Sequence, residues 1–158
     1  MFGPRLAILA ALLLSGCTNS ASVTSRDDNP PPSPGEVEVP GSAEIGYGRI
    51  GDTVTFDTDS AVLSSTAQSL LQKQAAWLTA FAGHRVIIEG HADERGTREY
   101  NLALGERRAR AVMDYLIALG IAANRLKTIS YGKERPICTE PNEACWNRNR
   151  RTVTTLDD

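Results

Sequence analysis

The chain contains 158 residues, of which 41% are hydrophobic, 23% charged and 6% aromatic. This length provides for one small domain, and the composition excludes collagen-like, wholly disordered and polytopic membrane proteins. The balance of 17 Lys and Arg residues against 19 Asp and Glu residues gives a formal net charge of −2, without the positive excess typical of nucleic-acid-binding domains. We therefore expect one globular domain that has no nucleic-acid partner.

Residues 1–16 have the pattern of a secretory signal peptide. Arg5 supplies one positive charge, and residues 6–14 form a wholly apolar run. Such a run is too short to cross a bilayer, which needs about 20 apolar residues, so we expect the segment to be removed after export. The motif Leu14-Ser15-Gly16-Cys17 resembles the bacterial lipobox, in which the cysteine receives the lipid. The alternative is that Cys17 is a buried cysteine in a short helix.

Residues 17–45 are expected to form a flexible tether that begins at the lipidated Cys17. They are rich in Ser, Thr, Asn, Asp, Gly and Pro, include four prolines within residues 29–35 and show no apolar periodicity. Such a segment averages about 30 Å end to end as a coil and reaches roughly 90 Å when extended. The alternative is an ordered loop packed on the domain, which is expected to occupy residues 46–158.

The apolar periodicity over 46–158 predicts four strands and two main helices. In chain order these are a strand over 49–56, a helix that begins at a Ser64 or Ser65 cap and ends at Gly83, a strand over 85–90, a helix over 99–119, and strands over 126–131 and 151–156. The helix residues expected to face the core are Ala67, Leu70, Leu71, Ala75, Leu78, Phe81, Ala109, Val112, Met113 and Leu116. The order β-α-β-α-β-β predicts an α/β sandwich in which both helices pack on one face of a mixed four-stranded sheet.

Cys138 and Cys145 lie in a segment rich in turn residues. Because the export signal places the chain outside the reducing cytosol, we expect a disulfide between them. Such a bridge contributes about 2.5 kcal/mol in the chain-entropy model. The alternatives are two free thiols, which an oxidising compartment does not preserve, and a metal site, for which only His84 and His91 are available as imidazole ligands.

Four polar residues at the end of the strand over 85–90 are the candidates for catalysis: Glu89, His91, Asp93 and Glu94. A small periplasmic cell-wall hydrolase would use Glu89 and Asp93 as paired carboxylates. Such an enzyme needs a cleft deep enough to desolvate one carboxyl group, and a domain this small has few residues with which to form such a cleft. The sequence also has no Gly-rich phosphate loop, no Gly-x-Ser-x-Gly motif and no His-Glu-x-x-His motif. We expect a protein without catalytic activity and without a cofactor.

Asp93 follows this strand, and Arg108 lies in the first turns of the next helix, on the edge of its apolar stripe. The two side chains are therefore expected to face one small space. A zwitterionic amino-acid group would place its carboxylate on the guanidinium and its ammonium on the aspartate. The alternative is a plain salt bridge between Asp93 and Arg108 that ties the loop to the helix and contributes little stability.

The densest polar run of the sequence is Glu89-Gly90-His91-Ala92-Asp93-Glu94-Arg95-Gly96-Thr97, followed by Glu99-Tyr100-Asn101 and Leu104-Gly105-Glu106-Arg107-Arg108-Ala109. Two later motifs are Ser130-Tyr131-Gly132-Lys133-Glu134-Arg135-Pro136 and Asn149-Arg150-Arg151. Together these segments resemble the signature of the OmpA-like domain family, in its branch of peptidoglycan-associated lipoproteins. The resemblance spans about residues 49–155 and agrees with the lipobox and the tether.

This resemblance implies an OmpA-like fold and non-catalytic binding of peptidoglycan through the diaminopimelate of its stem peptide. The implied binding residues are Asp93 and Arg108 for the ammonium and the carboxylate, Leu104 for a backbone contact, Arg95 beside the site, and Thr58 and Asp59 on the opposite wall. The implied partners are peptidoglycan, the lipid of the outer membrane through Cys17, and TolB, the periplasmic propeller protein of the Tol system. The implied role lies in envelope integrity and cell division.

The sequence departs from the family pattern in two places. The Cys138–Cys145 segment is not a general feature of the family, and the end of the chain, residues 154–158, is more polar than usual. We expect both departures to leave the binding site untouched.

Overall fold

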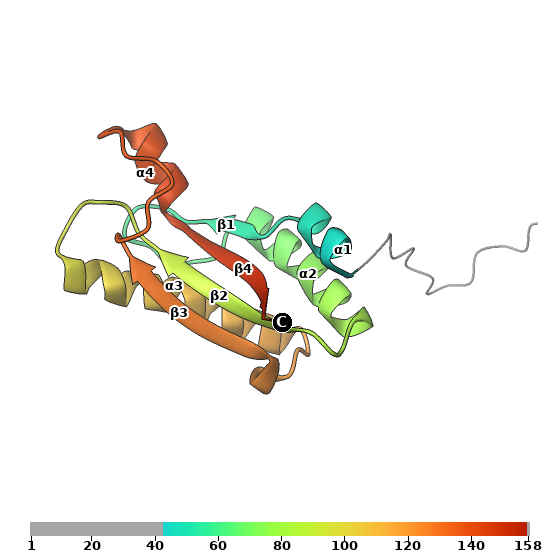
Figure 1. The fold of residues 1–158 in the computed structure, drawn as a ribbon. Coiled ribbons are helices and arrows are strands. Elements are labelled where there is room, and N and C mark those ends of the chain that lie inside the picture. Colours follow the sequence, from blue (N-terminus) through green and yellow to red (C-terminus); the bar gives the residue numbers. More distant parts are fainter. Residues whose placement is uncertain (1–42, 158) are drawn as a thin grey trace, which may run out of the picture. The chain divides into compact units, whose positions relative to one another are not determined.

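The computed structural model describes residues 43–157, in which helices and strands alternate (Figure 1). The elements are α1 (Ala43–Ile50), β1 (Thr53–Thr55), α2 (Ser65–Ala80), β2 (Arg85–His91), α3 (Arg98–Ala118), a 3₁₀ turn (Ala123–Arg125), β3 (Leu126–Gly132), α4 (Glu143–Asn149) and β4 (Arg151–Asp157). Within these residues, no helix combines the length and apolar character needed to cross a bilayer. The predicted signal peptide, Cys17 and the predicted tether up to residue 42 lie outside the described residues.

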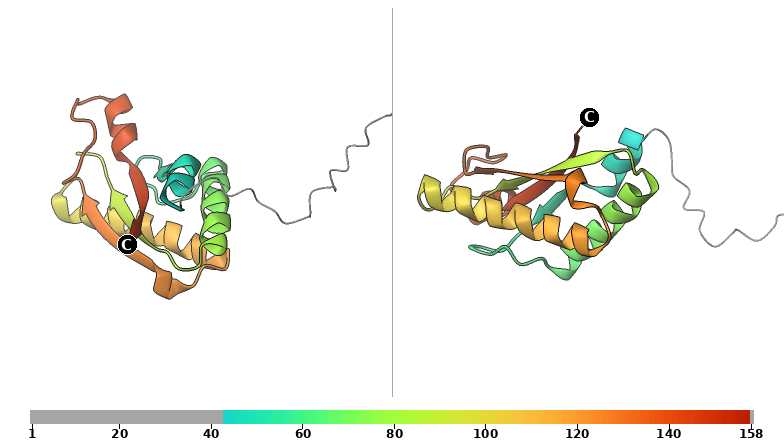
Figure 2. Two further views of the ribbon diagram at one scale, coloured as in Figure 1. Left: turned by 45° about the vertical axis from the view of Figure 1, so that its right-hand side comes forward. Right: turned by 90° about the horizontal axis from the view of Figure 1, so that it is seen from below.

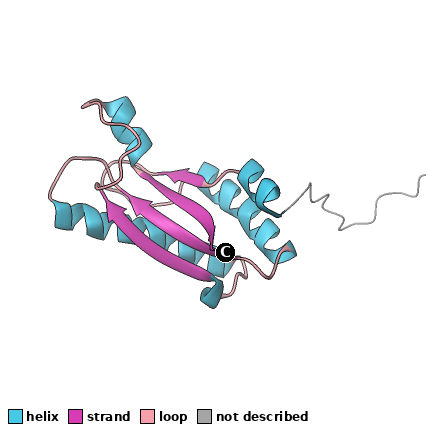
Figure 3. Ribbon diagram, in the orientation of Figure 1, coloured by secondary structure: helices cyan, strands magenta, loops and turns pink. Residues whose placement is uncertain are grey.

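The four strands form one mixed sheet, as the sequence predicts, and their order in it is β1-β4-β2-β3 (Figure 3). β4 lies between β1 and β2 and runs antiparallel to both. β2 and β3 are parallel, with Val86 opposite Leu126 and Ile88 opposite Thr128. A parallel pair needs a crossover connection, and α3 provides it. The ends of β2 and β3 therefore lie together, next to the loop that leads from β2 into α3.

α3 packs across β2 and β3, and α2 packs against α3 and β1 (Figure 2). Val86 and Ile88 of β2 are buried, whereas Ile87 and Glu89, which alternate with them, are half-buried on the other face. The core consists of Tyr47, Val54, Phe56, Ala67, Leu71, Ala75, Trp77, Leu78, Val86, Ile88, Ala109, Val112, Leu116, Ile121 and Leu126. The predicted stripe residues Leu70, Phe81 and Met113 are partly buried against this core. The predicted packing of the two main helices on the sheet is therefore confirmed.

Side-chain caps determine where the two main helices begin. The Ser64 hydroxyl accepts a hydrogen bond from the Ala67 amide at 3.1 Å, so Ser64 rather than Ser65 caps α2. Thr97 caps α3 in the same way and accepts from the Tyr100 amide at 3.2 Å. Thr97 is also the last residue of the loop after β2, so this cap fixes the point at which the loop joins α3.

The first predicted strand, over 49–56, is wrong at its start. Helix α1 occupies Ala43–Ile50, and β1 is confined to Thr53–Thr55. Gly51 separates the two elements with a φ of 97°, a conformation that favours glycine. Tyr47 of α1 is buried, with its ring centroid 5.0 Å from that of Trp77 in α2. The predicted start of the domain, residue 46, therefore lies inside a helix that begins at Ala43.

The segment between β3 and β4, expected as a loop, contains the short helix α4. The Asn142 side chain caps this helix and accepts a hydrogen bond from the Cys145 amide at 2.9 Å. A disulfide between Cys138 and Cys145 joins the first turn of α4 to the residues that precede it. Helix α4 has seven residues, too few to produce a clear apolar period in the sequence.

α3 approaches the sheet closely at two glycines, Gly90 in β2 and Gly105 in α3. A Cβ atom on Gly90 would lie 1.9 Å from the Gly105 carbonyl oxygen. A Cβ atom on Gly105 would lie 2.4 Å from Ser130 Oγ and 2.9 Å from the Gly90 carbonyl oxygen. Neither position has room for a larger residue. The two glycines therefore allow the first half of α3 to approach the end of β2 closely.

Gly105→Ala is expected to lower the free energy of unfolding by about 1–3 kcal/mol, because the added methyl group pushes α3 away from the sheet. Gly48→Ala is the matched control, since Gly48 also lies in a helix but a Cβ atom there meets nothing within 4 Å. This control should be neutral or slightly stabilising. Denaturant unfolding of both variants measures the difference, and equal unfolding energies would contradict the importance of the close contact.

Candidate binding site

The loop after β1 and the loop between β2 and α3 enclose a pocket of about 300 Å³. Its lining residues are Thr58, Asp59, Asp93, Arg95, Gly96, Tyr100, Asn101 and Leu104. Of the six residues implied for peptidoglycan binding, Arg108 is the one that is not part of this lining. The structure thus brings Thr58, Asp59, Asp93, Arg95 and Leu104 together around one space.

Asp93 is the acidic centre of the pocket and is 7% exposed. It accepts hydrogen bonds from the Arg95 amide at 3.1 Å, from Arg95 Nε at 3.1 Å and from Arg95 Nη2 at 2.7 Å. Arg150 Nη1 approaches the same carboxylate at 3.4 Å. Burial raises the pKa of Asp93, but these hydrogen bonds and the charge of Arg95 outweigh it, so that the pKa of Asp93 lies below its ordinary value. Asp93 is therefore an anion at neutral pH.

Arg108 lies behind the loop after β1 and is completely buried. Its Nε donates to the Ser60 carbonyl at 2.8 Å, its Nη1 to the His91 carbonyl at 2.8 Å and its Nη2 to the Asp57 carbonyl at 3.0 Å. Burial lowers the pKa of Arg108 to about 10, so the guanidinium stays protonated at neutral pH. A buried, charged side chain thus connects the loop after β1 to the end of β2.

The bonds made by Arg108 fix both loops that form the pocket. Thr58 and Asp59 lie between the two residues of the first loop whose carbonyls Arg108 holds. A guanidinium has five N–H donors, and three of those of Arg108 make these hydrogen bonds. Within residues 43–157, the ion pairs of Asp93 go to Arg95 and Arg150, and the alternative of a direct Asp93–Arg108 salt bridge is not observed.

The opposite wall of the pocket comes from the loop after β1. Asp59 has a φ of 54°, which directs the chain through a tight turn, and its carboxylate accepts a hydrogen bond from the Tyr100 hydroxyl. Thr58 Oγ1 accepts from Arg95 Nη2 at 3.4 Å. Leu104 is 5% exposed and adds an apolar surface to the lining. The two walls are therefore linked by side chains across the pocket.

Two further side chains shape the loop between β2 and α3, although the sequence did not single them out as site residues. The side-chain nitrogen of Asn101, Nδ2, donates to the carbonyls of Arg95 at 2.7 Å and Thr97 at 3.0 Å. Lys133 Nζ donates to the Gly96 carbonyl at 2.6 Å. Both residues belong to motifs that carry the family resemblance. These motifs were the signal in the sequence that could have identified them as site residues.

Arg150 is a third residue near the pocket that the sequence did not single out. Besides its contact with Asp93, its Nε donates to the Phe56 carbonyl at 3.1 Å and its Nη2 to Glu143 Oε1 at 2.7 Å. It therefore joins the end of β1, the pocket and α4. Its signal in the sequence was the Asn149-Arg150-Arg151 motif.

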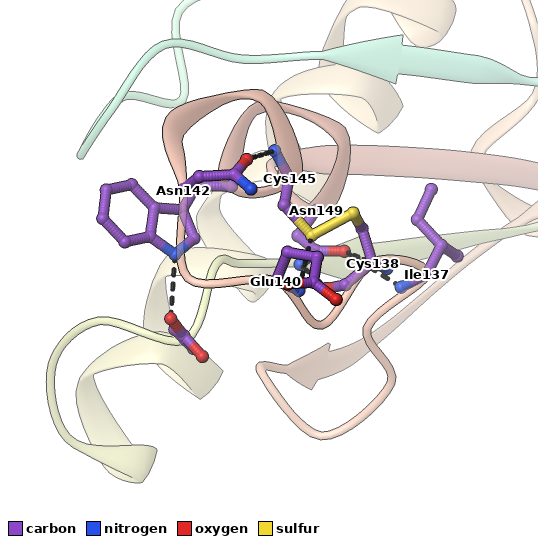
Figure 4. The surroundings of a disulfide bond; sticks show 8 residues. Ile137, Cys138, Glu140, Asn142, Cys145 and Asn149 are labelled. Carbon is purple, nitrogen blue, oxygen red and sulfur yellow. Dashed lines mark hydrogen bonds between the residues drawn. A yellow bond between two sulfur atoms is a disulfide. The ribbon is translucent and has the colours of Figure 1, made fainter.

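The disulfide between Cys138 and Cys145 is present in the structure (Figure 4). The Asn149 side chain supports it, since Asn149 Oδ1 accepts from the Cys138 amide at 3.2 Å and Asn149 Nδ2 donates to the Cys138 carbonyl at 2.6 Å. The helix that contains Cys145 contacts a residue of the pocket lining, because the Trp146 ring centroid lies 4.3 Å from the Arg95 guanidinium. The expectation that this segment leaves the site untouched is therefore wrong.

The candidate catalytic residues do not form a catalytic pair. Glu89 is not part of the pocket lining, and its carboxylate lies 3.7 Å from His91 Nε2. The lowered pKa of Asp93 is the reverse of what a general acid requires. Burial, assisted by Arg151 and Arg135, lowers the pKa of His91 to about 4, so its imidazole is neutral at pH 7. In the part of the chain that the structure describes, no three His, Cys, Asp or Glu side chains gather as a metal site.

Comparison with known proteins identifies the class of this domain. The model of the OmpA family matches residues 55–150. The chain is 48% identical to the peptidoglycan-associated lipoprotein of Mesorhizobium japonicum, over 96% of this chain and 89% of that protein. It is 46% identical to the protein of the same name from Agrobacterium fabrum, over 96% and 85% of the two chains. The crystal structure of the peptidoglycan-associated lipoprotein from Burkholderia pseudomallei superposes with a TM-score of 0.66 at 40% identity, over 67% of this chain and 90% of that chain.

The fold is thus that of an OmpA-type domain, and the chain belongs to the OmpA family. Its relatives over nearly the whole chain are the peptidoglycan-associated lipoproteins. The resemblance found in the sequence is therefore confirmed.

Proposed function

We propose that this chain is a lipid-anchored outer-membrane protein that binds peptidoglycan non-covalently and catalyses no reaction on it. Its similarity over 96% of the chain to proteins named peptidoglycan-associated lipoproteins supports this proposal. The pocket supports it chemically, because an ionised Asp93 lines a space whose two walls are joined by the protonated Arg108. This pairing of an anion with a nearby cation is the observation that carries the proposal.

The ligand group assigned to the pocket is the free end of diaminopimelate, which bears an ammonium and a carboxylate on one carbon. The family resemblance assigns the ammonium to Asp93 and the carboxylate to Arg108, whose guanidinium is completely buried behind the loop after β1. Leu104 adds a backbone contact, and Arg95 flanks the bound group. Thr58 and Asp59 close the pocket on the other side.

A comparison of two chemical types of peptidoglycan tests this assignment. The full chain, kept in solution by detergent, should sediment with isolated diaminopimelate-type peptidoglycan and release no soluble fragments. Lysine-type peptidoglycan lacks the distal carboxylate, so it should bind about 10- to 100-fold more weakly, the range expected for the loss of one hydrogen bond between charged groups. Equal binding of the two types of peptidoglycan would contradict the diaminopimelate assignment, and release of soluble fragments would instead support a hydrolase.

The position of α1 agrees with an anchored protein. α1 packs on α2, away from the loop between β2 and α3 that lines the pocket (Figure 1). The chain therefore enters the domain at a distance from the pocket. A lipid at Cys17 and a wall fragment in the pocket can then be bound by one molecule at the same time, which is the arrangement that a link between membrane and wall needs.

Cys17→Ser is expected to remove the protein from the membrane fraction and to leave peptidoglycan binding unchanged, because Cys17 is proposed to carry the lipid. Stable anchoring needs two or more acyl chains, and the family pattern attaches three. Thr18 is not acidic, which in the better-known bacteria is consistent with transfer to the outer membrane. Labelling of wild type and variant with a radioactive fatty acid provides the measurement. A wild-type protein that takes up no label would exclude the anchor.

We extend the proposal to TolB as a protein partner and to a role in envelope integrity and cell division, on the support of the family resemblance. The full chain should co-purify with TolB of the same bacterium. Adding soluble diaminopimelate-type wall fragments to this complex then measures whether the two partners compete. Absence of any complex would remove TolB from the proposal and would leave the peptidoglycan assignment intact.

A further inference from the structure

Helix α4, whose first turn the disulfide holds, places two side chains beside Arg95 of the pocket lining. The Trp146 ring of α4 lies 4.3 Å from the Arg95 guanidinium, and its indole N–H donates to Glu94 Oε1 at 2.9 Å. Glu143, in the first turn of α4, places Oε2 3.9 Å from Arg95 Nη1. The same carboxylate binds Arg150 at 2.7 Å. These contacts connect α4 to both arginines that pair with the pocket carboxylate.

Arg95 is the more exposed of the two arginines that pair with Asp93, so burial restrains its side chain less. Its side chain is 39% exposed, whereas that of Arg150 is 5% exposed. From the loop between β2 and α3, Arg95 reaches Asp93 and, across the pocket, Thr58. A long side chain in this position loses considerable rotamer freedom when it is held in one geometry. An aromatic ring on one face of the guanidinium limits that freedom.

We propose that Trp146 and Glu143 position Arg95 at the mouth of the pocket, so that the disulfide-closed helix α4 is a structural part of the peptidoglycan-binding site. This inference rests on the proposed function. Trp146 supplies the surface on which the Arg95 guanidinium stacks, and Glu143 attracts its outer nitrogen. Arg95 then keeps the Asp93 carboxylate oriented for the ligand ammonium.

The disulfide is the element that keeps α4 in place for this task. Cys145 is buried, and the bond to Cys138 holds the first turn of the helix. Trp146 is the residue directly after Cys145, so any displacement of this turn moves the ring that contacts Arg95. Replacing both cysteines by serine should therefore weaken peptidoglycan binding at temperatures at which the domain remains folded.

A double-mutant cycle on the full chain tests the positioning role. Trp146→Leu should weaken sedimentation with diaminopimelate-type peptidoglycan by about 2- to 5-fold, the range expected for one exposed cation–π contact. Trp146→Phe keeps an aromatic ring and should restore most of the binding. In an Arg95→Ala background, Trp146→Leu should have no further effect, because the side chain that it positions is absent. A tryptophan that served the fold alone would not show this dependence on Arg95.

A matched pair of glutamates provides the control. Glu143→Gln should weaken binding more in the presence of Arg95 than in the Arg95→Ala background, where only its ion pair with Arg150 is lost. Glu140→Gln should leave binding unchanged, since Glu140 lies in the same closed segment without an ion pair to Arg95 among the residues described. Melting curves identify any variant that is unfolded at the assay temperature, and the cycle is measured below its transition. Equal loss from Trp146→Leu in both backgrounds, or full binding by the cysteine-free variant, would overturn the inference while wild-type binding upholds the proposed function. A wild-type chain that does not sediment with peptidoglycan would overturn both.

Discussion

Arg108→Ala is expected to lower the free energy of unfolding by about 2–4 kcal/mol, the largest loss of stability predicted for this domain. The substitution removes the guanidinium donor from three backbone carbonyls, of which that of Asp57 keeps a longer hydrogen bond from the Ser60 amide at 3.3 Å. It also creates a cavity at a side chain that is completely buried. In a domain of this size, the loss should lower the melting temperature by roughly 10 °C or more.

Arg110→Ala is the matched control for this prediction. Arg110 lies two residues further along the same helix and is exposed, so its replacement should change stability by no more than about 0.5 kcal/mol. Arg108→Lys should fall between the two, because a single ammonium nitrogen cannot match three carbonyls that a planar fork reaches in different directions. Equal melting temperatures for Arg108→Ala and Arg110→Ala would show that the three hydrogen bonds contribute no net stability.

This expected result differs from what the sequence alone suggests for Arg108. Its place on the edge of the apolar stripe of α3 correctly predicts that it points away from open solvent. The sequence does not predict its partners, because they are backbone carbonyls, which every residue possesses and no side-chain pattern marks. A role in holding the two pocket loops together was therefore visible only in the folded chain.

The parts of the fold that the sequence predicts correctly are those in which local signals agree with long-range packing. For α3, the Thr97 cap, the apolar period and the stop at Gly120 all describe the same helix. The loop before it is bounded by β2 and by that cap, so the position of Asp93 after the strand indicated a place at the site, whereas Arg95 was expected there from the family resemblance. Both residues line one pocket.

The parts that were not predicted depend on contacts between distant residues. α1 is a short helix whose burial rests on the contact of Tyr47 with Trp77, thirty positions away in the sequence. α4 is shorter still and is stabilised by the disulfide and by Asn149. Isolated helices of these lengths are marginal in water, so local propensity does not reveal them. The contact of Trp146 with Arg95 had no signal in the sequence for the same reason.

Asp93→Asn is expected to weaken binding to diaminopimelate-type peptidoglycan by about 30-fold to several thousand-fold, corresponding to about 2–5 kcal/mol. The amide has nearly the shape of the carboxylate but no charge with which to hold an ammonium group. Its NH₂ group would also face the donors of Arg95 and Arg150, so part of the pocket would be left unpaired. Sedimentation of the full chain with increasing amounts of peptidoglycan measures the loss.

The same substitution should change the dependence of stability on pH. The pKa of Asp93 is lower in the folded chain than its ordinary value, so the ionised carboxylate stabilises the fold at pH values above the unfolded pKa of about 3.9. This contribution is lost as the pH falls through the folded pKa, because the proton then binds to both states. Wild type should therefore be more stable than Asp93→Asn at neutral pH, and the two unfolding energies should converge in strong acid.

Asp114→Asn separates the effect of this site from a general effect of charge. Asp114 is exposed on α3 and does not line the pocket, so its replacement removes the same charge without touching Asp93 or its arginine partners. It should bind peptidoglycan like the wild type and should leave the difference in stability between neutral and acid pH unchanged. If Asp93→Asn also bound like the wild type while remaining folded, Asp93 would hold only its two arginines, and the ligand ammonium would have to bind elsewhere.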